Sequence, residues 1–405
     1  MVISSRLFLI AFLILFAGLS SNATSAEVFE LLTVSNQRLT GQIQTWNDDA
    51  IKLLTNDGKT QSIPTGDLVW LRSPGRQPQV VNGGPLVVLA NGDRLRGTVI
   101  GIDELAVRMK WSVFSQLPVA EIPFETVQAI FADVPRLADP RRRVIALGLK
   151  PYAGQDLIRL KNRDELTGVL LGMKDDKLTL DRNGKEIPVS TKDVQAVRLD
   201  DEIISFPAPT TARVLLTLAD GSWITLTRWK LIDGREITGQ AACGIELTLP
   251  LADVISGRLL GGKTTWLTEL SPAQFRFIPF LQTQRDLRVN RNVLDGYLQL
   301  DGREYPIGLG AISHSEVTYT LGKQYRHFRA RIGLDDAAEG RGMAVFRVDV
   351  DGEERFRSEP HTGKESAESL EIDVANAETL TLIIEFGPRG DVRDYANWID
   401  PVLLP

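Results

Sequence analysis

One pattern recurs four times between residue 28 and about residue 260, and it constrains the fold more than any other feature of the chain. Each copy begins with a β-rich segment and a turn, followed by a second strand. The second copy shows this best, with the segment 87–89, the turn 91–93 and the strand 95–99. Within the second strand the corresponding residues are Gly41, Gly97, Gly168 and, in the fourth copy, Leu226. Because each repeat of this length is one supersecondary unit, the pattern predicts an array of similar β units.

Each copy also closes with the same signature, an aliphatic residue followed by proline. The pairs are Ile63-Pro64, Ile122-Pro123, Ile187-Pro188 and Leu249-Pro250. A valine that opens a further short strand follows each pair. Glycine within a strand marks a bulge or a sharp bend, and proline fits an edge strand because it cannot donate to the ladder. We therefore predict that each copy is a small, strongly bent sheet of four or five strands.

Small bent sheets of this size resemble SH3-like or Sm-like barrels, and this resemblance rests on architecture alone. It implies repeated small β-barrel units, and it leaves open whether they stay separate or fuse in pairs. The predicted units cover residues 27–75, 84–134, 156–206 and 212–262. Between the second and third units, Asp139-Pro140 predicts a short helix within a connector over residues 135–155, since proline is favoured in the first turn of a helix.

The N-terminus predicts export. Arg6 is the only charged residue before Glu27, residues 7–19 are almost wholly apolar, and small polar residues lead to Ala26. This order is typical of a secretory signal peptide, here residues 1–26 with cleavage near Ala26. The apolar run is shorter than the roughly 20 residues of a spanning helix, which disfavours the alternative of an uncleaved anchor. We expect a secreted or periplasmic protein without a transmembrane span.

Charge and cysteine content limit the possible partners and cross-links of the protein. The net charge is −6, with acidic and basic residues well mixed, which argues against nucleic acid as a partner because such binding needs clustered Lys and Arg. Cys243 is the only cysteine, so an internal disulfide cannot form. A buried thiol in an apolar strand is the favoured reading, and intermolecular pairing is the alternative.

From Trp266 onward the pattern changes to short strands that alternate apolar and polar residues. One such strand carries Ala344, Phe346, Val348 and Val350 on one face. Similar alternation marks the segments 317–321, 328–332, 370–374 and 380–386. Strands with a single apolar face must pack face to face, so this region is predicted to be a β-sandwich.

Six segments of this region form an ordered set. They are WLTELSP at 266–272, YPIGLG at 305–310, SEVTYTL at 315–321, FRARIGLDD at 328–336, FRVDVDG at 346–352 and DYANWIDP at 394–401. Together they resemble the NPCBM family, carbohydrate-binding modules noted beside certain glycoside hydrolases. The resemblance implies a galactose-binding-like jelly-roll β-sandwich over residues 263–405. It departs from the family at Ile312, where a His is common, with His314 two residues away, and at Asn397, where Asp is frequent.

Candidate sugar ligands gather in residues 391–400. Aromatic faces bind the C–H groups of sugars, and planar polar side chains match vicinal hydroxyls. The candidates are Tyr395, Asn397, Trp398, Asp394 and, on the neighbouring segment, His314. Tyr395 is the favoured platform, because Trp398 is as readily a core residue. Three tryptophans of the repeats are expected to be exposed and could serve as further platforms: Trp46, Trp111 and Trp229.

No motif in the sequence predicts catalysis. The three histidines lack metal-ligand spacing, and there is no Gly-x-Ser-x-Gly elbow and no phosphate loop. We therefore expect no catalytic residue, no metal and no cofactor, and glycans or polysaccharide as partners. Two alternatives stay open. One is an envelope protein whose sandwich has lost sugar binding and packs on other proteins, which Ile312 favours, and the other is a hydrolase, or an accessory part of one, with an unrecognised site.

Overall fold

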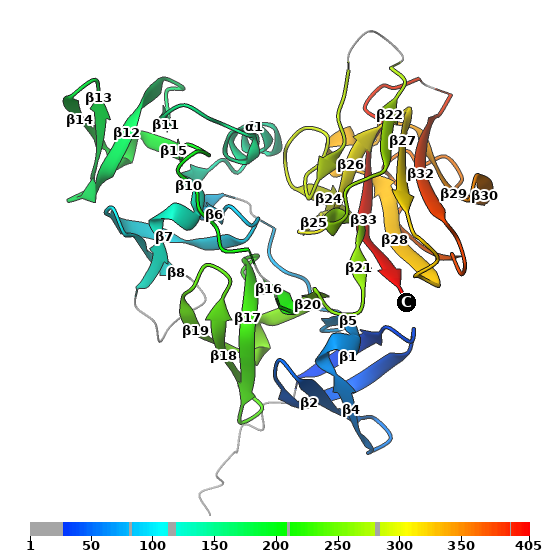
Figure 1. The fold of residues 1–405 in the computed structure, drawn as a ribbon. Helices are drawn as coiled ribbons and strands as arrows, with labels where there is room; N and C mark the ends of the chain where they lie inside the picture. Colours follow the sequence, from blue (N-terminus) through cyan, green and yellow to red (C-terminus); the bar gives the residue numbers. More distant parts are fainter. Residues whose placement is uncertain (1–26, 81–82, 112–118, 209–210, 280–283, 389) are drawn as a thin grey trace, which may run out of the picture.

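The computed structural model describes residues 27–405 except 81–82, 112–118, 209–210, 280–283 and 389 (Figure 1). The predicted signal peptide, residues 1–26, lies outside the described residues. Across the described part, the chain is nearly all β and has one α-helix, α1 (Ala138–Leu149). The all-β prediction is confirmed. No helix within this part is long and apolar enough to cross a membrane.

Four units of five strands each make up the N-terminal part. The first contains β1 (Val28–Thr33), β2 (Arg38–Trp46), β3 (Ala50–Thr55), β4 (Thr60–Pro64) and β5 (Leu68–Arg72). The second contains β6 (Gly84–Leu89), β7 (Arg94–Ile102), β8 (Ala106–Trp111), β9 (Ala120–Pro123) and β10 (Val127–Val134). The third contains β11 (Asp156–Leu160), β12 (Glu165–Lys174), β13 (Lys177–Arg182), β14 (Lys185–Ser190) and β15 (Val194–Arg198). The fourth contains β16 (Arg213–Leu218), β17 (Trp223–Ile232), β18 (Glu236–Ala241), β19 (Glu246–Pro250) and β20 (Val254–Leu260).

The strands pair in the same way in every unit. The first strand pairs antiparallel with the second and the fifth, and the third pairs with the second and the fourth. A 3₁₀ turn precedes each fifth strand: η1 (Thr65–Asp67), η2 (Phe124–Thr126), η3 (Thr191–Asp193) and η4 (Leu251–Asp253). The likeness of these units to SH3-like or Sm-like barrels stays a prediction.

The glycine of the second strand is required by a close approach of two backbones. A Cβ atom on Gly41 would lie 2.2 Å from the carbonyl oxygen of Leu54, and one on Gly97 would lie 2.3 Å from that of Lys110. Gly168 is placed in the same way, 2.3 Å from the oxygen of Asp181. In the fourth unit the glycine has changed strand, since Gly239 on β18 approaches a carbonyl of β17. Only a residue without a side chain permits this bend.

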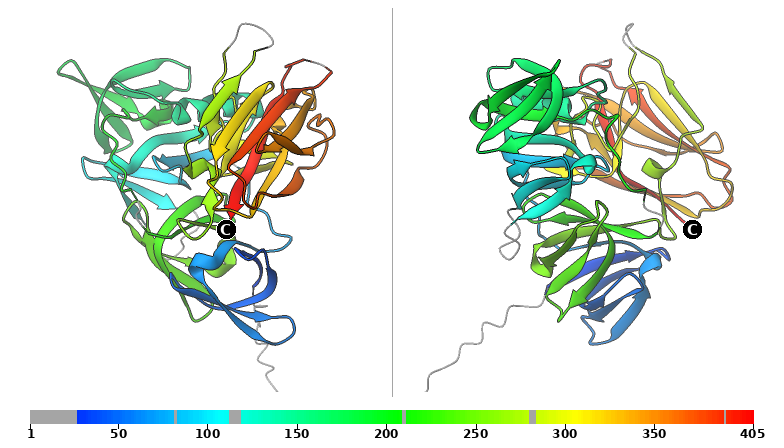
Figure 2. Two further views of the ribbon diagram at one scale, coloured as in Figure 1. Left: turned by 45° about the vertical axis from the view of Figure 1, so that its right-hand side comes forward. Right: turned by 60° about the vertical axis from the view of Figure 1, so that its left-hand side comes forward.

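The units fuse in two pairs through their fifth strands. The fifth strand of the first unit, β5, pairs antiparallel with β20 of the fourth, with Leu71 opposite Gly257. The second and third units join in the same way, with Ala129 of β10 opposite Arg198 of β15. Figure 2 shows the first and fourth units at one end of the molecule, with the other pair above them and the C-terminal region beside both.

The expectation that three tryptophans of the repeats are exposed is wrong. Trp46, Trp111 and Trp229 are 1%, 4% and 3% exposed. Trp46 of the first unit and Trp229 of the fourth meet edge to face, with ring centroids 5.8 Å apart. Trp111 of the second unit donates its indole N–H to Ser222 Oγ of the fourth at 3.3 Å. Contacts between units bury these rings. The sequence of a single unit does not indicate which residues of another unit it contacts, so this burial could not be predicted. Cys243 is buried, as predicted.

The C-terminal region is a sandwich of two sheets, as predicted. One sheet holds β23 (Arg288–Val289), β26 (Gly308–Ile312), β33 (Tyr395–Leu404), β28 (His327–Leu334) and β31 (Glu368–Asp373), with β21 (Thr265–Trp266) on β33. The other holds β22 (Gln274–Phe277), β27 (Ser315–Thr320), β32 (Thr379–Phe386), β29 (Ala344–Val350) and β30 (Glu353–Arg357). A small hairpin, β24 (Leu298–Leu300) and β25 (Arg303–Tyr305), and the 3₁₀ turns η5 (Leu267–Glu269) and η6 (Asp336–Ala338) complete it. The predicted apolar faces, including Phe346, Val348 and Leu382, form the core between the sheets.

The sandwich packs directly on the repeats. An apolar cluster runs through both parts, with Leu32, Leu86, Phe131 and Trp223 from the units, Val144 from α1, and Trp266, Tyr297 and Val402 from the sandwich. The indole N–H of Trp266 donates to the carbonyl oxygen of Leu259 at 2.7 Å. The repeats and the sandwich therefore share one buried apolar cluster.

A buried ion pair lies where the two pairs of units meet the sandwich. Arg94 Nη2 of β7 lies 2.7 Å from Glu304 Oε2 of β25, and both side chains are almost fully buried. The guanidinium also stacks on Trp223, 3.6 Å from the ring centroid, and donates from Nε to the carbonyl oxygen of Gly221 at 2.8 Å. The ring centroid of Tyr297 lies 4.4 Å from the guanidinium carbon and 5.1 Å from the ring centroid of Trp223, so the two rings adjoin around Arg94. One arginine thus links the second unit, the fourth unit and the sandwich.

Replacement of Asp93 by Asn tests a buried carboxyl next to this junction. Asp93 accepts bonds from the backbone N–H of Thr225 at 2.9 Å and from its hydroxyl at 2.8 Å, and burial raises the pKa of Asp93 to about 6. A raised pKa stabilises the fold below the unfolded value near 3.8, and this stabilisation is lost as the pH rises through about 6. An Asn preserves both contacts, because the threonine hydroxyl can turn to accept.

We expect the stability of Asp93→Asn relative to wild type to rise between pH 4 and pH 7 by as much as ~3 kcal/mol. Urea unfolding at both pH values measures this difference. The exposed substitution Asp48→Asn controls for removal of a charge. A difference between Asp93→Asn and wild type that does not change with pH would contradict the assignment.

Candidate functional site

The predicted sugar ligands gather at one end of the sandwich, where β26 ends and β33 begins. Ile312 pairs with Tyr395 across these two strands, which places the turn that contains His314 next to Asp394. The hydroxyl of Ser313 donates to Asp394 Oδ2 at 2.6 Å. The structure therefore brings the five candidates close together, on β33 and on the residues that adjoin β26 and β33, although the two segments are about 80 residues apart in the chain.

Asp394 organises this end of the sandwich from inside. Its side chain is fully buried, and Oδ1 accepts from the backbone N–H of Met343 at 2.7 Å. Burial raises the pKa of Asp394 to about 6, although the hydrogen bond from Ser313 acts to lower it. The carboxyl group thus ties the turn after β26 to the loop before β29, and it does not face solvent.

Asn397 is held in a buried polar cluster beneath the β24–β25 hairpin. Its Nδ2 donates to Asp335 Oδ2 at 2.7 Å. Asp335 also accepts from the backbone N–H groups of Gln299 and Ala337, each at 3.0 Å, and burial raises the pKa of Asp335 to about 6. Asn292 donates to the same carboxyl group at 3.3 Å. Asn397 and Asp335 therefore fix the hairpin and η6 to the main sheet.

Trp398 is a core residue, which was the alternative that the sequence left open. It is 2% exposed and meets Phe346 edge to face at 5.2 Å. Trp398, Asn397 and Asp394 are buried, so their side chains stabilise this end of the sandwich and do not face solvent. Tyr395 and His314 are the two candidates that stay partly exposed, and His314 Nε2 lies 3.0 Å from Glu316 Oε1.

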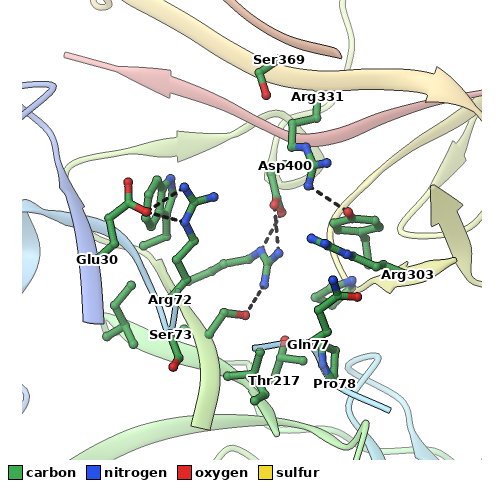
Figure 3. Close-up of a pocket in the computed structure, with 18 of the residues that line it drawn as sticks. Glu30, Arg72, Ser73, Gln77, Pro78, Thr217, Arg303, Arg331, Ser369 and Asp400 are labelled. Atoms are coloured by element: carbon green, nitrogen blue, oxygen red, sulfur yellow. Dashed lines mark hydrogen bonds and ion pairs between the residues drawn. The ribbon is translucent and has the colours of Figure 1, made fainter. Parts of the chain in front are cut away.

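A second candidate site lies between the repeats and the sandwich, and sequence reasoning missed it. It is a cavity of about 530 Å³ bounded by β5 and β20 on one side and by β25, β28, β31 and β33 on the other (Figure 3). Cavities of 300–1,000 Å³ are typical of small-molecule sites. Its floor, which includes Ser73, Arg258 and Tyr305, is buried, whereas Arg72, Gln77 and Ser369 at its rim are exposed.

Arginines dominate the walls of this cavity. Arg258 makes a two-pronged ion pair with Asp400 at 2.6 and 2.9 Å, which joins β20 to β33. Arg72 contacts Glu30 at 2.7 Å. Arg331 donates to the hydroxyl of Tyr305 at 2.8 Å. No local sequence motif predicts this site. Its residues are far apart in the sequence and come together only through the pairing of β5 with β20 and the packing of the sandwich on the repeats.

Metal binding has no support from side-chain geometry. Within the described residues there is no group of three or more His, Cys, Asp and Glu side chains that could hold a metal ion. The carboxyl groups of Asp335 and Asp336 have partners within the protein. Asp335 caps η6, and Asp336 Oδ2 accepts from the backbone N–H of Gly302 at 2.9 Å.

Residues 263–404 match the family model of the NPCBM/NEW2 domain, so this part of the chain is an NPCBM domain. The resemblance read from the six sequence segments is confirmed. The match covers the sandwich and does not extend to the four repeat units.

One curated protein and several solved structures are similar to this chain over part or most of its length. A protein of Renibacterium salmoninarum that bears the name of an endo-alpha-N-acetylgalactosaminidase is 31% identical over 107 residues, which are 26% of this chain and 7% of that relative. The chain therefore spans only a small part of that relative's length. Among solved structures, CBM51 from Clostridium perfringens GH95 in complex with methyl-galactose is 23% identical over 35% of this chain and 99% of that chain, with a TM-score of 0.32. The tandem CBM51 modules of a family 98 glycoside hydrolase from Streptococcus pneumoniae are 11% identical over 93% of this chain and 99% of theirs, with a TM-score of 0.31.

Proposed function

We propose that this protein is exported and binds glycans through its C-terminal domain without catalysing a reaction. The observation that carries the proposal is the NPCBM domain over residues 263–404. The signal-peptide pattern of residues 1–26 supports export. The lack of any catalytic motif in the sequence supports a binding role, since an enzyme would need a placed acid, base or nucleophile.

The rim of the sandwich is the proposed contact surface. Tyr395 supplies an aromatic ring that is partly exposed, and the His314–Glu316 pair supplies polar groups two and four residues beyond Ile312, the strand partner of Tyr395. Asp394 acts as a positioning residue, because it holds the turn of Ser313 and the loop of Met343 in place. An aromatic face next to planar polar groups is the arrangement that sugars require.

A glycan array probed with residues 27–405 tests this proposal. We expect saturable binding to at least one glycan class, and we expect Tyr395→Ala to weaken it about tenfold or more, because a stacked ring contributes a large share of the binding energy at small interfaces. Tyr325→Ala is the matched control: this tyrosine is also half-buried but lies beside Leu404 at the opposite end of β33. Flat titrations across the array would refute the proposal, and equal loss in both variants would move the site away from Tyr395.

A second function is favoured by one observation. Ile312 stands where a polar ring is common in the family, and it is buried. A sandwich that has lost its sugar contacts would act as an interaction module in the cell envelope. Recovery of an envelope protein by cross-linking, together with a silent glycan array, would favour this alternative.

A further inference from the structure

The cavity between the repeats and the sandwich carries a surplus of positive charge. Its walls contain seven arginines, Arg38, Arg72, Arg76, Arg258, Arg303, Arg329 and Arg331, against four carboxylates, Glu30, Glu304, Glu371 and Asp400. Glu304 is already committed to Arg94, which lies outside the cavity, at 2.7 Å. Arg76 and Arg331 have carboxylate partners outside the cavity, Glu27 at 3.1 Å and Asp301 at 3.8 Å. Three carboxylates therefore remain for five guanidinium groups, and this surplus makes the cavity a binding region for anions.

Two polar groups in the walls have no hydrogen-bond partner among the described residues. Nε of Arg303 is buried and unpaired, and no ion pair is formed by this side chain in the described part of the chain. Oγ1 of Thr217 is also unpaired, and Thr217 is only 3% exposed. Figure 3 shows both residues at the cavity, with Arg303 pointing into it on the side of Asp400. Burying an unpaired polar group is costly, so these groups are suited to a ligand that supplies acceptors.

The remaining arginines are already held in place. Asp400 and Ser256 fix Arg258, with the Arg258–Ser256 contact at 3.3 Å. Arg72 is fixed by Glu30 and by stacking on Trp70, at 4.7 Å from the ring centroid. A rigid guanidinium loses less entropy when it binds an oxyanion, and its planar fork matches carboxylate and sulfate groups. The cavity is thus preorganised for an oxyanion.

We propose that this cavity binds an acidic saccharide, a sugar that carries a carboxylate or a sulfate group. Arg303 would receive the oxyanion, and Thr217 and Gln77 would contact hydroxyl groups of the ring. The sugar assignment rests on the proposed function, because the NPCBM domain forms one wall of the cavity. The other wall comes from the repeats, which gives the first and fourth units a direct part in recognition.

Calorimetric titration of residues 27–405 tests this site. The ligands are galacturonic acid and galactose 6-sulfate, with galactose as the neutral match and sodium sulfate as the free anion. We expect at least one acidic sugar to bind more tightly than galactose and more tightly than sulfate, and we expect the affinity to fall as the salt concentration rises. The two acidic sugars distinguish a carboxylate from a sulfate as the recognised group.

Two substitutions make the result specific to the cavity. Arg303→Gln is expected to lower the affinity for the acidic sugar about tenfold or more, because a charge-assisted bond is lost, and to leave galactose binding unchanged. Thr217→Val removes the unpaired hydroxyl at constant shape, and we expect it to weaken binding severalfold while the protein stays folded. Arg355→Gln, an exposed arginine paired with Glu353 outside the cavity, is the matched control.

The outcomes separate this inference from the proposed function. If glycans bind but Arg303→Gln has the affinity of wild type, the cavity proposal is overturned and glycan binding through the rim stands. If sodium sulfate binds as tightly as the acidic sugars, the cavity is a general anion site and the saccharide assignment is overturned. If no glycan binds at all, both proposals fail.

Discussion

Arg94→Ala is expected to destabilise the folded protein by about 3–5 kcal/mol, because it leaves Glu304 as an unpaired charge in a buried position. The pair is 2.7 Å apart, and the two side chains are 1% and 4% exposed. The substitution also removes the group that packs against both Trp223 and Tyr297. Urea unfolding of residues 27–405, followed by tryptophan fluorescence, measures the loss.

The double variant Arg94→Met with Glu304→Gln separates charge from packing. Removing both charges avoids the buried unpaired carboxylate, so we expect this variant to be clearly more stable than Arg94→Ala. Arg38→Ala is the control, since Arg38 is exposed and contacts Glu30 at 3.5 Å, a surface pair worth roughly 0–1 kcal/mol. A loss for Arg94→Ala that does not exceed the loss for Arg38→Ala would contradict the role given to this junction.

Gly41→Ala is expected to cost about 3 kcal/mol of stability, although alanine is a small residue. Its Cβ would lie 2.2 Å from the carbonyl oxygen of Leu54 and 2.9 Å from the Cα of Thr55. Both are backbone atoms of β3, so the overlap can be relieved only by separating two paired strands. Thermal and urea unfolding of the variant measure the cost.

Gly66→Ala in the same unit is the matched control. No atom outside its immediate neighbours lies within 4 Å of a Cβ added there, so we expect a change of less than ~0.5 kcal/mol. Equal stability of the two variants would show that the second strand does not need glycine. The same contrast should hold for Gly97 and Gly168, because a Cβ added to either glycine would lie 2.3 Å from a carbonyl oxygen.

The sequence predicted the features that depend on local pattern. The strands of the sandwich follow from the alternation of residues such as Phe346 and Val348, since neighbouring side chains of a strand point to opposite faces. The recurrence of Gly41, Gly97 and Gly168 predicted a bent second strand, and the structure shows the backbone contact that requires it. The NPCBM domain could be identified because its segments keep their order along the chain.

The candidate site was predicted less well, because local pattern does not report burial. Asp394, Asn397 and Trp398 are polar or aromatic residues of a rim segment, a composition that suits a sugar site. Their burial comes from partners that lie far away in sequence, such as Ser313, Asp335 and Phe346. Tyr395 and His314 escaped this burial, and they remain the candidates that can reach a ligand at the rim.

Sequence alone was sufficient for the class of fold and the family of the C-terminal domain, because each depends on spacing within one segment. Which unit pairs with which could not be predicted from the sequence. Pairing of β5 with β20 and of β10 with β15 joins like strands of different units, and each unit carries the same strand pattern. Only the tertiary contacts select one partner over another, and they also assemble the arginine-lined cavity from residues between Glu30 and Val402.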